Sequence, residues 1–293
     1  MATLPRGWRI AAFLSLFLLA ACAVPPKRAL DPSARSVTER DAIVIIPQGE
    51  IRAVIKPSTA GAPFGLVGAL IDLGVNQYRA NTAEEEVKPI RDGLAGYDFD
   101  RRALEGARVA ATKIDWLNVR NFTFTKDPTK DQILKRLDQT AADQFLVAAY
   151  SYTFTPDFAQ LTVALRVGLY PKKPPQGVQA DQRLARGNEL YEQQFVILVD
   201  APSKSDNTDA NVAQWAANNA QATRAALDSG IAKVHELLVR SLSQSPEAAA
   251  ALDHGAEAKI SDKHGALVER GPGGTLIYQK DSGTWVFGRE NVS

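Results

Sequence analysis

Alternation of apolar and polar residues is clearest in the middle of the chain. The segments 144–154 and 161–170 are rich in β-branched, aromatic and leucine residues, and Thr155-Pro156-Asp157 between them is typical of a turn. In the second segment, every other residue from Leu161 to Leu169 is a leucine or a valine. This is the period of a strand with one buried face. We therefore predict an antiparallel hairpin.

Other periodic segments predict further strands and several helices. Strands are expected at 42–46, 51–56, 119–124 and 191–199. Helical spacing predicts a helix that carries Glu84-Glu85-Glu86 in its first turn, one from Asp100, a short one that starts at Asp127-Pro128, and a long one over 209–242. Gly230 would weaken the long helix by about 1 kcal/mol relative to alanine.

The C-terminal segment has a different pattern. Short strands are expected at 265–269, 275–279 and 284–287, separated by glycine-rich turns. Three short strands rarely fold alone, so Tyr278 and Trp285 are expected to pack on the main body. The alternative is that these two aromatic side chains stay partly exposed and contact a partner, because aromatic residues are common in interfaces.

These elements predict an α/β protein of the α+β kind, with a mixed, mainly antiparallel sheet, packed helices and a C-terminal β meander. We expect an α/β domain at 41–245 and the meander at 246–293, packed on that domain. Of the 293 residues, 45% are hydrophobic, which is enough for a substantial core. The order of the predicted strands and helices is loosely similar to that in the periplasmic domains of lipoproteins of curli secretion and of penicillin-binding-protein activators.

The N-terminus has the layout of a secretory signal. Arg6 and Arg9 precede an apolar run over 10–21, which is shorter than the roughly 20 residues needed to span a bilayer. Leu19-Ala20-Ala21-Cys22 resembles the lipobox of bacterial lipoproteins. The resemblance implies that residues 1–21 are removed and that Cys22 becomes a lipidated N-terminus. Ordinary cleavage within Ala21-Cys22-Ala23 is the alternative, and it would leave a soluble periplasmic protein.

Lipidation at Cys22 would attach the protein to a membrane essentially permanently. Ala23 is unlike the aspartate that this family associates with inner-membrane retention, so we expect the periplasmic side of the outer membrane. Residues 22–40 include Pro25-Pro26 and Pro32 and lack apolar periodicity, which predicts a flexible tether with a span on the order of 25 Å.

A glycine-rich segment over 61–75 is predicted to be helical. Gly61, Gly65 and Gly68 follow one another at four- and three-residue spacing. This spacing allows close helix packing, either in a membrane or between copies of the chain. The alternative, which we favour, is a helix packed tightly on the sheet. An oligomer formed through Gly61–Gly74 stays an alternative without independent support.

Charge and cysteine content bear on nucleic-acid binding and on disulfide formation. Removal of residues 1–21 takes away two of 34 basic and none of 33 acidic residues, so the formal side-chain charge becomes −1. This balance gives no basis for binding nucleic acid. The single cysteine cannot form an internal disulfide.

Catalytic motifs are absent from the sequence. His235, His254 and His264 lack zinc-site spacing, and there is no nucleophile elbow, phosphate-binding loop or dinucleotide fingerprint. We assign no catalytic residue, metal or cofactor. The expected function is a non-enzymatic interaction or assembly factor that binds an envelope protein. The rival hypothesis is a periplasmic hydrolase of cell-wall or carbohydrate material, because a pair of catalytic carboxylates needs no fixed spacing.

Overall fold

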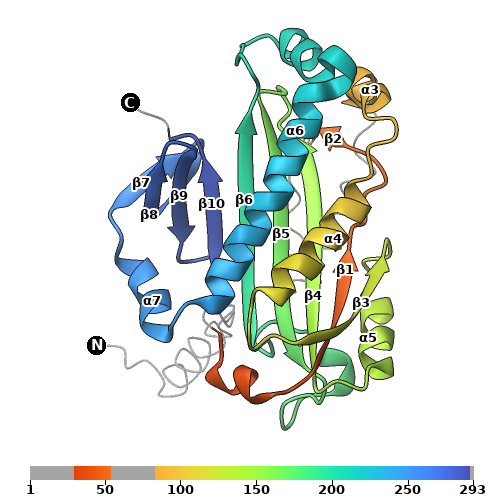
Figure 1. Ribbon diagram of the computed structural model, residues 1–293, viewed down its shortest axis with the longest axis vertical. Helices are drawn as coiled ribbons and strands as arrows, with labels where there is room; N and C mark the ends of the chain where they lie inside the picture. The colour runs from red at the N-terminus through yellow and green to blue at the C-terminus, as the bar shows by residue number, and fades with distance from the viewer. Residues whose placement is uncertain (1–29, 54–82, 291–293) are drawn as a thin grey trace, which may run out of the picture.

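A single mixed sheet forms the centre of the protein (Figure 1). The computed structural model describes residues 30–53 and 83–290. The sheet has ten strands in the order β3-β1-β4-β5-β6-β10-β9-β8-β7, and β2 pairs with β4 beyond the end of β1. Its strands are β1 (Arg40–Ile45), β2 (Arg52–Ala53), β3 (Val119–Thr125), β4 (Gln144–Phe154), β5 (Gln160–Pro171), β6 (Tyr191–Asp200), β7 (Glu257–Ile260), β8 (Lys263–Gly271), β9 (Gly274–Gln279) and β10 (Thr284–Gly288).

The helices lie on both faces of the sheet. They are α3 (Ala83–Gly93), α4 (Phe99–Thr112), α5 (Lys130–Gln139), α6 (Thr208–Ser243) and α7 (Pro246–Ala251), with short 3-10 turns η2 (Pro32–Ser36), η5 (Ala180–Gln182) and η6 (Leu252–His254). The predicted α+β class, mixed and mainly antiparallel sheet and C-terminal meander are confirmed. No helix among the described residues is long and apolar enough to cross a membrane. The predicted signal peptide 1–21, Cys22 and the Gly61–Gly74 helix lie outside the described residues.

The predicted hairpin is confirmed as β4 and β5. They pair antiparallel from Phe154 opposite Leu161 to Gln144 opposite Pro171. β1 pairs in parallel with both β4 and β3. Parallel pairing needs a long crossover connection, and α3 and α4 lie in the connection between β1 and β3. β1 therefore lies inside the sheet, and its six residues are all buried.

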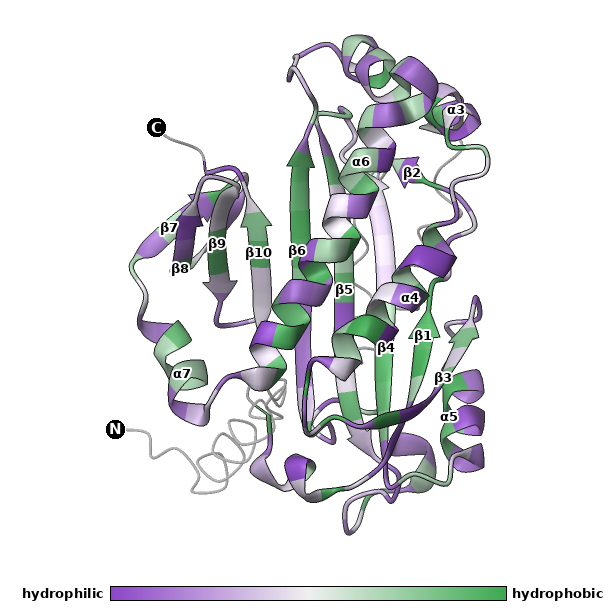
Figure 2. Ribbon diagram, viewed as in Figure 1, coloured by the Kyte–Doolittle hydropathy of each residue, from purple (hydrophilic) through white to green (hydrophobic). Residues whose placement is uncertain are grey.

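Strand periodicity divides the interior into two layers. Ala42 and Val44 of β1 belong to the larger core, which α4 and α6 cover. Ile43 and Ile45 point to the other face, where they pack with the apolar side of α5. Figure 2 shows the corresponding apolar stripes on the strands and on α6. The sheet is thus covered by α4 and α6 on one face and by α5 on part of the other.

The long predicted helix is interrupted. Residues 217–220 of α6 leave helical geometry, and Asn218, Asn219 and Ala220 have φ values of 53°, 56° and 55°. Asparagine tolerates this left-handed region better than most residues. The Arg224 guanidinium donates to the carbonyl oxygens of Asn219 and Gly93 at 3.0 and 2.6 Å, which ties the interruption to the end of α3. The prediction of one continuous helix is therefore wrong at this point.

The C-terminal strands extend the sheet. β10 pairs in parallel with β6, so the meander continues the main sheet edge to edge. Its Tyr278 and Trp285 side chains pack in the larger core, as predicted. β7 and α7 were not predicted. Ile260 at the end of β7 bridges to Glu290 after β10, so the meander curls back on itself around a small core that it shares with Leu198 of β6.

Tyr278 and Trp285 are buried within this arrangement. Their exposed fractions are 3% and 0%, and the Trp285 indole N–H donates to Oε1 of Gln193 at 2.6 Å. Both rings face α6 in the larger core. The prediction that they pack on the main body is therefore confirmed, and the partial exposure that the alternative required is wrong.

The N-terminal segment is packed rather than free from residue 30 onward. Asp31 N–H donates to the Leu190 carbonyl at 2.9 Å, and Ala34 is fully buried. Asp31 also caps η2, with Pro32 in the first position. The same proline and charges that predicted a solvated tether therefore form a capped turn. The prediction of a tether over 22–40 is wrong for its last ten or so residues.

Arg40 connects this segment to the sheet. Its guanidinium is fully buried and donates to Oε1 of Gln144 and the carbonyls of Trp116 and Leu117 at 2.8, 2.8 and 3.0 Å, and also to the Ala34 carbonyl. It stacks on the Trp116 ring at 4.8 Å. Burial lowers the pKa of Arg40 to about 10, so the side chain remains a cation at neutral pH.

The predicted start of the short helix is also corrected. α5 begins at Lys130 with Thr129 as the N-cap residue, not at Pro128. The Asp127 carboxylate instead accepts from the Thr129 N–H at 2.9 Å, which closes a turn before the helix.

Close packing of α6 on β5 depends on Gly230. A Cβ atom at this position would lie 2.6 Å from Cγ2 of Val163. The glycine that weakens the helix intrinsically is thus the residue that lets the helix approach the sheet.

We predict that Gly230→Ala lowers the free energy of unfolding. The close contact with Val163 should cost about 1–3 kcal/mol, which exceeds the gain of about 1 kcal/mol in helix propensity. Urea unfolding measures the change. Gly271→Ala is the control, because no atom lies within 4 Å of its added Cβ. Relief of the defect by Val163→Ala would support the stated cause, whereas a gain in stability for Gly230→Ala would contradict it.

His235 of α6 and Tyr150 of β4 form a buried pair. The Tyr150 hydroxyl and Nε2 of His235 are 2.6 Å apart. Gly106 of α4 leaves room for the imidazole, since a Cβ there would lie 2.3 Å from Cε1 of His235. Burial lowers the pKa of His235 to about 4. The ring is therefore neutral in the folded protein at neutral pH.

We predict that this pair makes stability depend on pH. Because the unfolded pKa is about 6.5, the unfolded chain takes up a proton first, and stability falls by about 3 kcal/mol as pH drops from 6.5 to 4. Above pH 6.5 the contribution is fully present. His235→Gln should flatten this part of the pH profile of urea unfolding, whereas exposed His264→Gln should not. An unchanged profile in the first variant would contradict the assignment.

Candidate functional site

Strand β3 is an open edge of the sheet. It is first in the strand order and pairs only with β1. The opposite edge differs, because β7 is bridged to Glu290 at its end. An edge strand presents unpaired backbone N–H and C=O groups, which can pair with another strand. β3 is therefore the more available edge for strand addition among the described residues.

The register of β3 divides its side chains between the two faces. Phe122 pairs with Ala42 and Phe124 with Val44, so both rings lie on the α4 side. Asn121 and Thr123 alternate with them and lie on the α5 side. Phe124 is 36% exposed, and Val109 on α4 is 55% exposed. These are the exposed large apolar residues in the described part of the chain.

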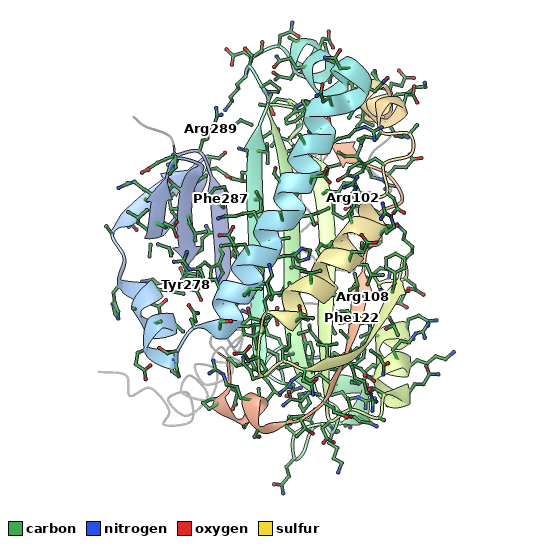
Figure 3. All side chains as sticks on the ribbon, in the orientation of Figure 1. Arg102, Arg108, Phe122, Tyr278, Phe287 and Arg289 are labelled. Atoms are coloured by element: carbon green, nitrogen blue, oxygen red, sulfur yellow. The ribbon has the colours of Figure 1, made fainter. Side chains whose placement is uncertain are left out.

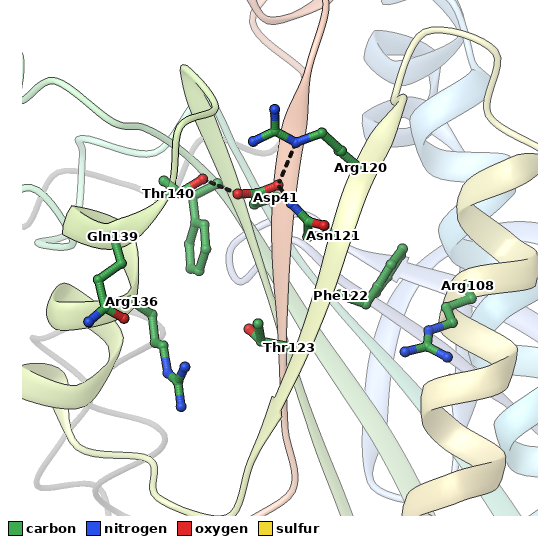
Figure 4. A pocket seen from close by; sticks show the side chains of 10 residues that line it. Asp41, Arg108, Arg120, Asn121, Phe122, Thr123, Arg136, Gln139 and Thr140 are labelled. Atoms are coloured by element: carbon green, nitrogen blue, oxygen red, sulfur yellow. Dashed lines mark hydrogen bonds and ion pairs between the residues drawn. The ribbon is translucent and has the colours of Figure 1, made fainter.

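A trough runs along this edge (Figure 4). Its volume is about 630 Å³, and residues 120–123 of β3 line its floor. Arg108 of α4 lies on one side of β3, and Arg136 and Gln139 of α5 lie on the other. A second groove of about 470 Å³ continues under α4 and shares Arg108 and Phe122 with the trough. Two helices therefore flank the open edge of β3.

Asp41 and Arg120 are paired within the trough. The Asp41 carboxylate accepts from Nδ2 of Asn121 at 3.0 Å and from the Thr140 hydroxyl, and lies 3.7 Å from Nε of Arg120. Arg120 also pairs with Glu39 at 2.9 Å. A register shift between Arg40 and Asp41 accommodates Arg120 as an additional residue. These contacts hold β3 on β1, and the charges of Asp41 and Arg120 are both compensated.

Arg108 and Arg136 have no such partners. Among the described residues, neither guanidinium forms an ion pair with a carboxylate, and both side chains are exposed. Arg108 lies over the Phe122 ring at 6.0 Å. Figure 3 shows Arg108 and Phe122 near each other, well away from Tyr278 in the meander. The trough thus has one uncompensated cation on each side.

Three grooves in the described part of the chain contain at most one carboxylate each. The trough contains one carboxylate, Asp41, the groove under α4 contains one, Asp115, and a groove of about 90 Å³ beside η2 contains none. A glycosidase needs two carboxylates flanking one substrate bond. In addition, no group of three or more metal-ligating side chains occurs in the described part of the chain.

A buried carboxylate lies elsewhere on the sheet. Oε1 of Glu192 accepts from Nε of Arg166 at 2.8 Å, and burial raises the pKa of Glu192. Glu192 is only 3% exposed. It lines none of the three grooves above. This ion pair joins the neighbouring strands β5 and β6 within the sheet.

Comparisons with known proteins identify no family. No protein-family model and no curated protein match the chain. Similar solved structures include the PelC dodecamer from Paraburkholderia phytofirmans, which is 8% identical, covers 72% of this chain and 92% of that chain, and has a TM-score of 0.23. A point variant of that PelC is 12% identical, with 75% and 95% coverage and a TM-score of 0.22. Such distant likeness carries no functional argument, so the function has to be argued from the geometry of the site.

We predict that Asp41→Asn loosens β3. Loss of the carboxylate weakens its contacts with Thr140, Asn121 and Arg120, and the buried partners should cost about 1–3 kcal/mol in unfolding free energy. Urea unfolding gives the total, and amide hydrogen exchange over residues 119–125 gives the local effect. Glu39→Gln removes only an exposed partner of Arg120 and should cost less than about 1 kcal/mol. Equal losses in the two variants would contradict this role of Asp41.

Proposed function

We propose that this protein is a lipid-anchored, non-enzymatic interaction or assembly factor on the periplasmic side of the outer membrane. Cys22 would carry the lipid, and the open edge of β3 would bind an envelope protein. The observation that carries the proposal is the trough, in which an unpaired strand edge lies between two helices that each supply an uncompensated arginine.

The packed N-terminal segment supports a short connection to the membrane. Seven residues separate Cys22 from Leu30, where the described structure begins. At 3.3–3.6 Å per residue, the eight steps from Cys22 to Leu30 span at most about 29 Å. A lipid on Cys22 would therefore hold the domain near the bilayer.

The position of β3 suits a protein held in this way. Arg40 N–H donates to the Asn118 carbonyl at 3.2 Å, so the start of β3 lies beside the N-terminal segment. β3 runs parallel to β1 and therefore leads away from that end of the molecule. Its open edge would be accessible from the side while the anchored end faces the membrane.

We predict that a photo-crosslinking amino acid in place of Phe124 captures an envelope protein in intact cells. The same amino acid in place of Glu247, an exposed residue of α7, is the control and should not capture that protein. Mass spectrometry identifies the captured chain. Cys22→Ala should reduce the captured amount, since the domain would no longer be held at the membrane.

The outcomes separate the parts of the proposal. Capture at Phe124 that is unchanged in Cys22→Ala would support the partner and contradict the anchor. Equal capture at both positions would contradict specific binding at β3. The absence of a defined partner at Phe124, with normal export of the protein, would contradict the proposed interaction.

A further inference from the structure

The geometry of the trough restricts the shape of its occupant. A strand added to the open edge of β3 would continue the sheet, and its successive side chains would point to opposite faces. One set would point toward α4 and the other toward α5, because these helices flank β3 (Figure 4). Two consecutive residues of the occupant would therefore meet different walls of the trough.

The charges of the walls restrict its chemistry. Arg108 supplies an unpaired guanidinium on the α4 side, and Arg136 supplies one on the α5 side. An exposed arginine favours a carboxylate, and a planar guanidinium can bind it through two parallel hydrogen bonds. The Asp41 carboxylate pairs with Arg120 at 3.7 Å rather than with either of these two cations.

We propose that the trough binds an extended segment of a partner protein with two adjacent acidic residues, one for Arg108 and one for Arg136. The inference rests on the proposed function and specifies the partner's chemistry. Apolar residues next to the acidic pair would contact Phe122 and Phe124 on the α4 side.

A second copy of this chain is a poorer occupant of the same edge. Pairing of β3 with β3 would bring the arginines of both copies into one trough, and like charges in such positions destabilise strand pairing. Charge complementarity therefore favours an acidic strand over self-association through β3.

Two synthetic peptides of equal charge and composition test the inference. Both are blocked at their ends, and both contain valine, threonine and two glutamates. The glutamates are adjacent in the first peptide and separated by one residue in the second, which places both on the same face of a strand. We expect the adjacent peptide to bind the protein two- to five-fold more tightly, as one additional exposed ion pair provides. Fluorescence anisotropy of labelled peptide at low ionic strength measures the dissociation constants.

Variants of the walls identify the contacts. Arg108→Gln and Arg136→Gln should each remove most of the preference for the adjacent peptide. Lys113→Gln at the end of α4 and Lys135→Gln on α5 change the same net charge at exposed positions outside the trough lining and should retain it. Circular dichroism checks that each variant is folded.

The results separate this inference from the proposed function. Equal binding of the two peptides, binding of neither, or loss of the preference in the lysine controls would overturn the inference. Capture of a partner at Phe124 could still stand in those cases, with a captured segment that lacks adjacent acidic residues. Binding of the adjacent peptide without any partner in cells would support the inference and contradict the proposed function.

Discussion

The buried guanidinium of Arg40 holds together the end of the molecule from which the open edge strand β3 extends. Among the described residues it pairs with no carboxylate and instead donates to three carbonyls and one side-chain amide. These acceptors belong to the N-terminal segment, the connection between α4 and β3, and β4. Burying a cation is costly, so each hydrogen bond is needed. The arrangement fixes the start of β1 relative to both neighbouring strands.

The position of β1 explains why the two edges of the sheet differ. β1 lies between β3 and β4, which leaves β3 with one neighbour. At the other end, β10 joins β6 and the chain curls until Ile260 reaches Glu290. One edge is therefore largely closed by its own meander, while the other remains open between α4 and α5. The proposed interaction follows from this asymmetry, which involves no catalytic group.

Much of the fold followed from local patterns. Alternation in 161–169 predicted β5 and its buried face, and glycine-rich turns predicted the meander. The interruption of α6 at Asn218 and Asn219 could not be predicted in this way, because it depends on Arg224 reaching the end of α3. The packing of residues 30–40 was also missed. The sequence around Arg40 does not show that one of its hydrogen-bond acceptors is Gln144, which lies far along the chain.

The candidate site was the least predictable part. Phe122 and Phe124 are typical of an ordinary strand, and nothing local shows that β3 lies at an edge. Arg108 and Arg136 belong to different helices, and only the order of the strands brings them to one trough. Tyr278 and Trp285 show the reverse: the sequence predicted that they pack on the main body, and the parallel pairing of β10 with β6 places them in its core.

Amide hydrogen exchange on the protein alone and in complex with its captured partner tests the central claim most directly. Protection should increase in residues 119–125 and stay unchanged in 257–260, because the partner would pair with the backbone of β3. Protection that increases elsewhere while β3 is unchanged would show that the partner does not add to this edge, and would contradict the proposed interaction.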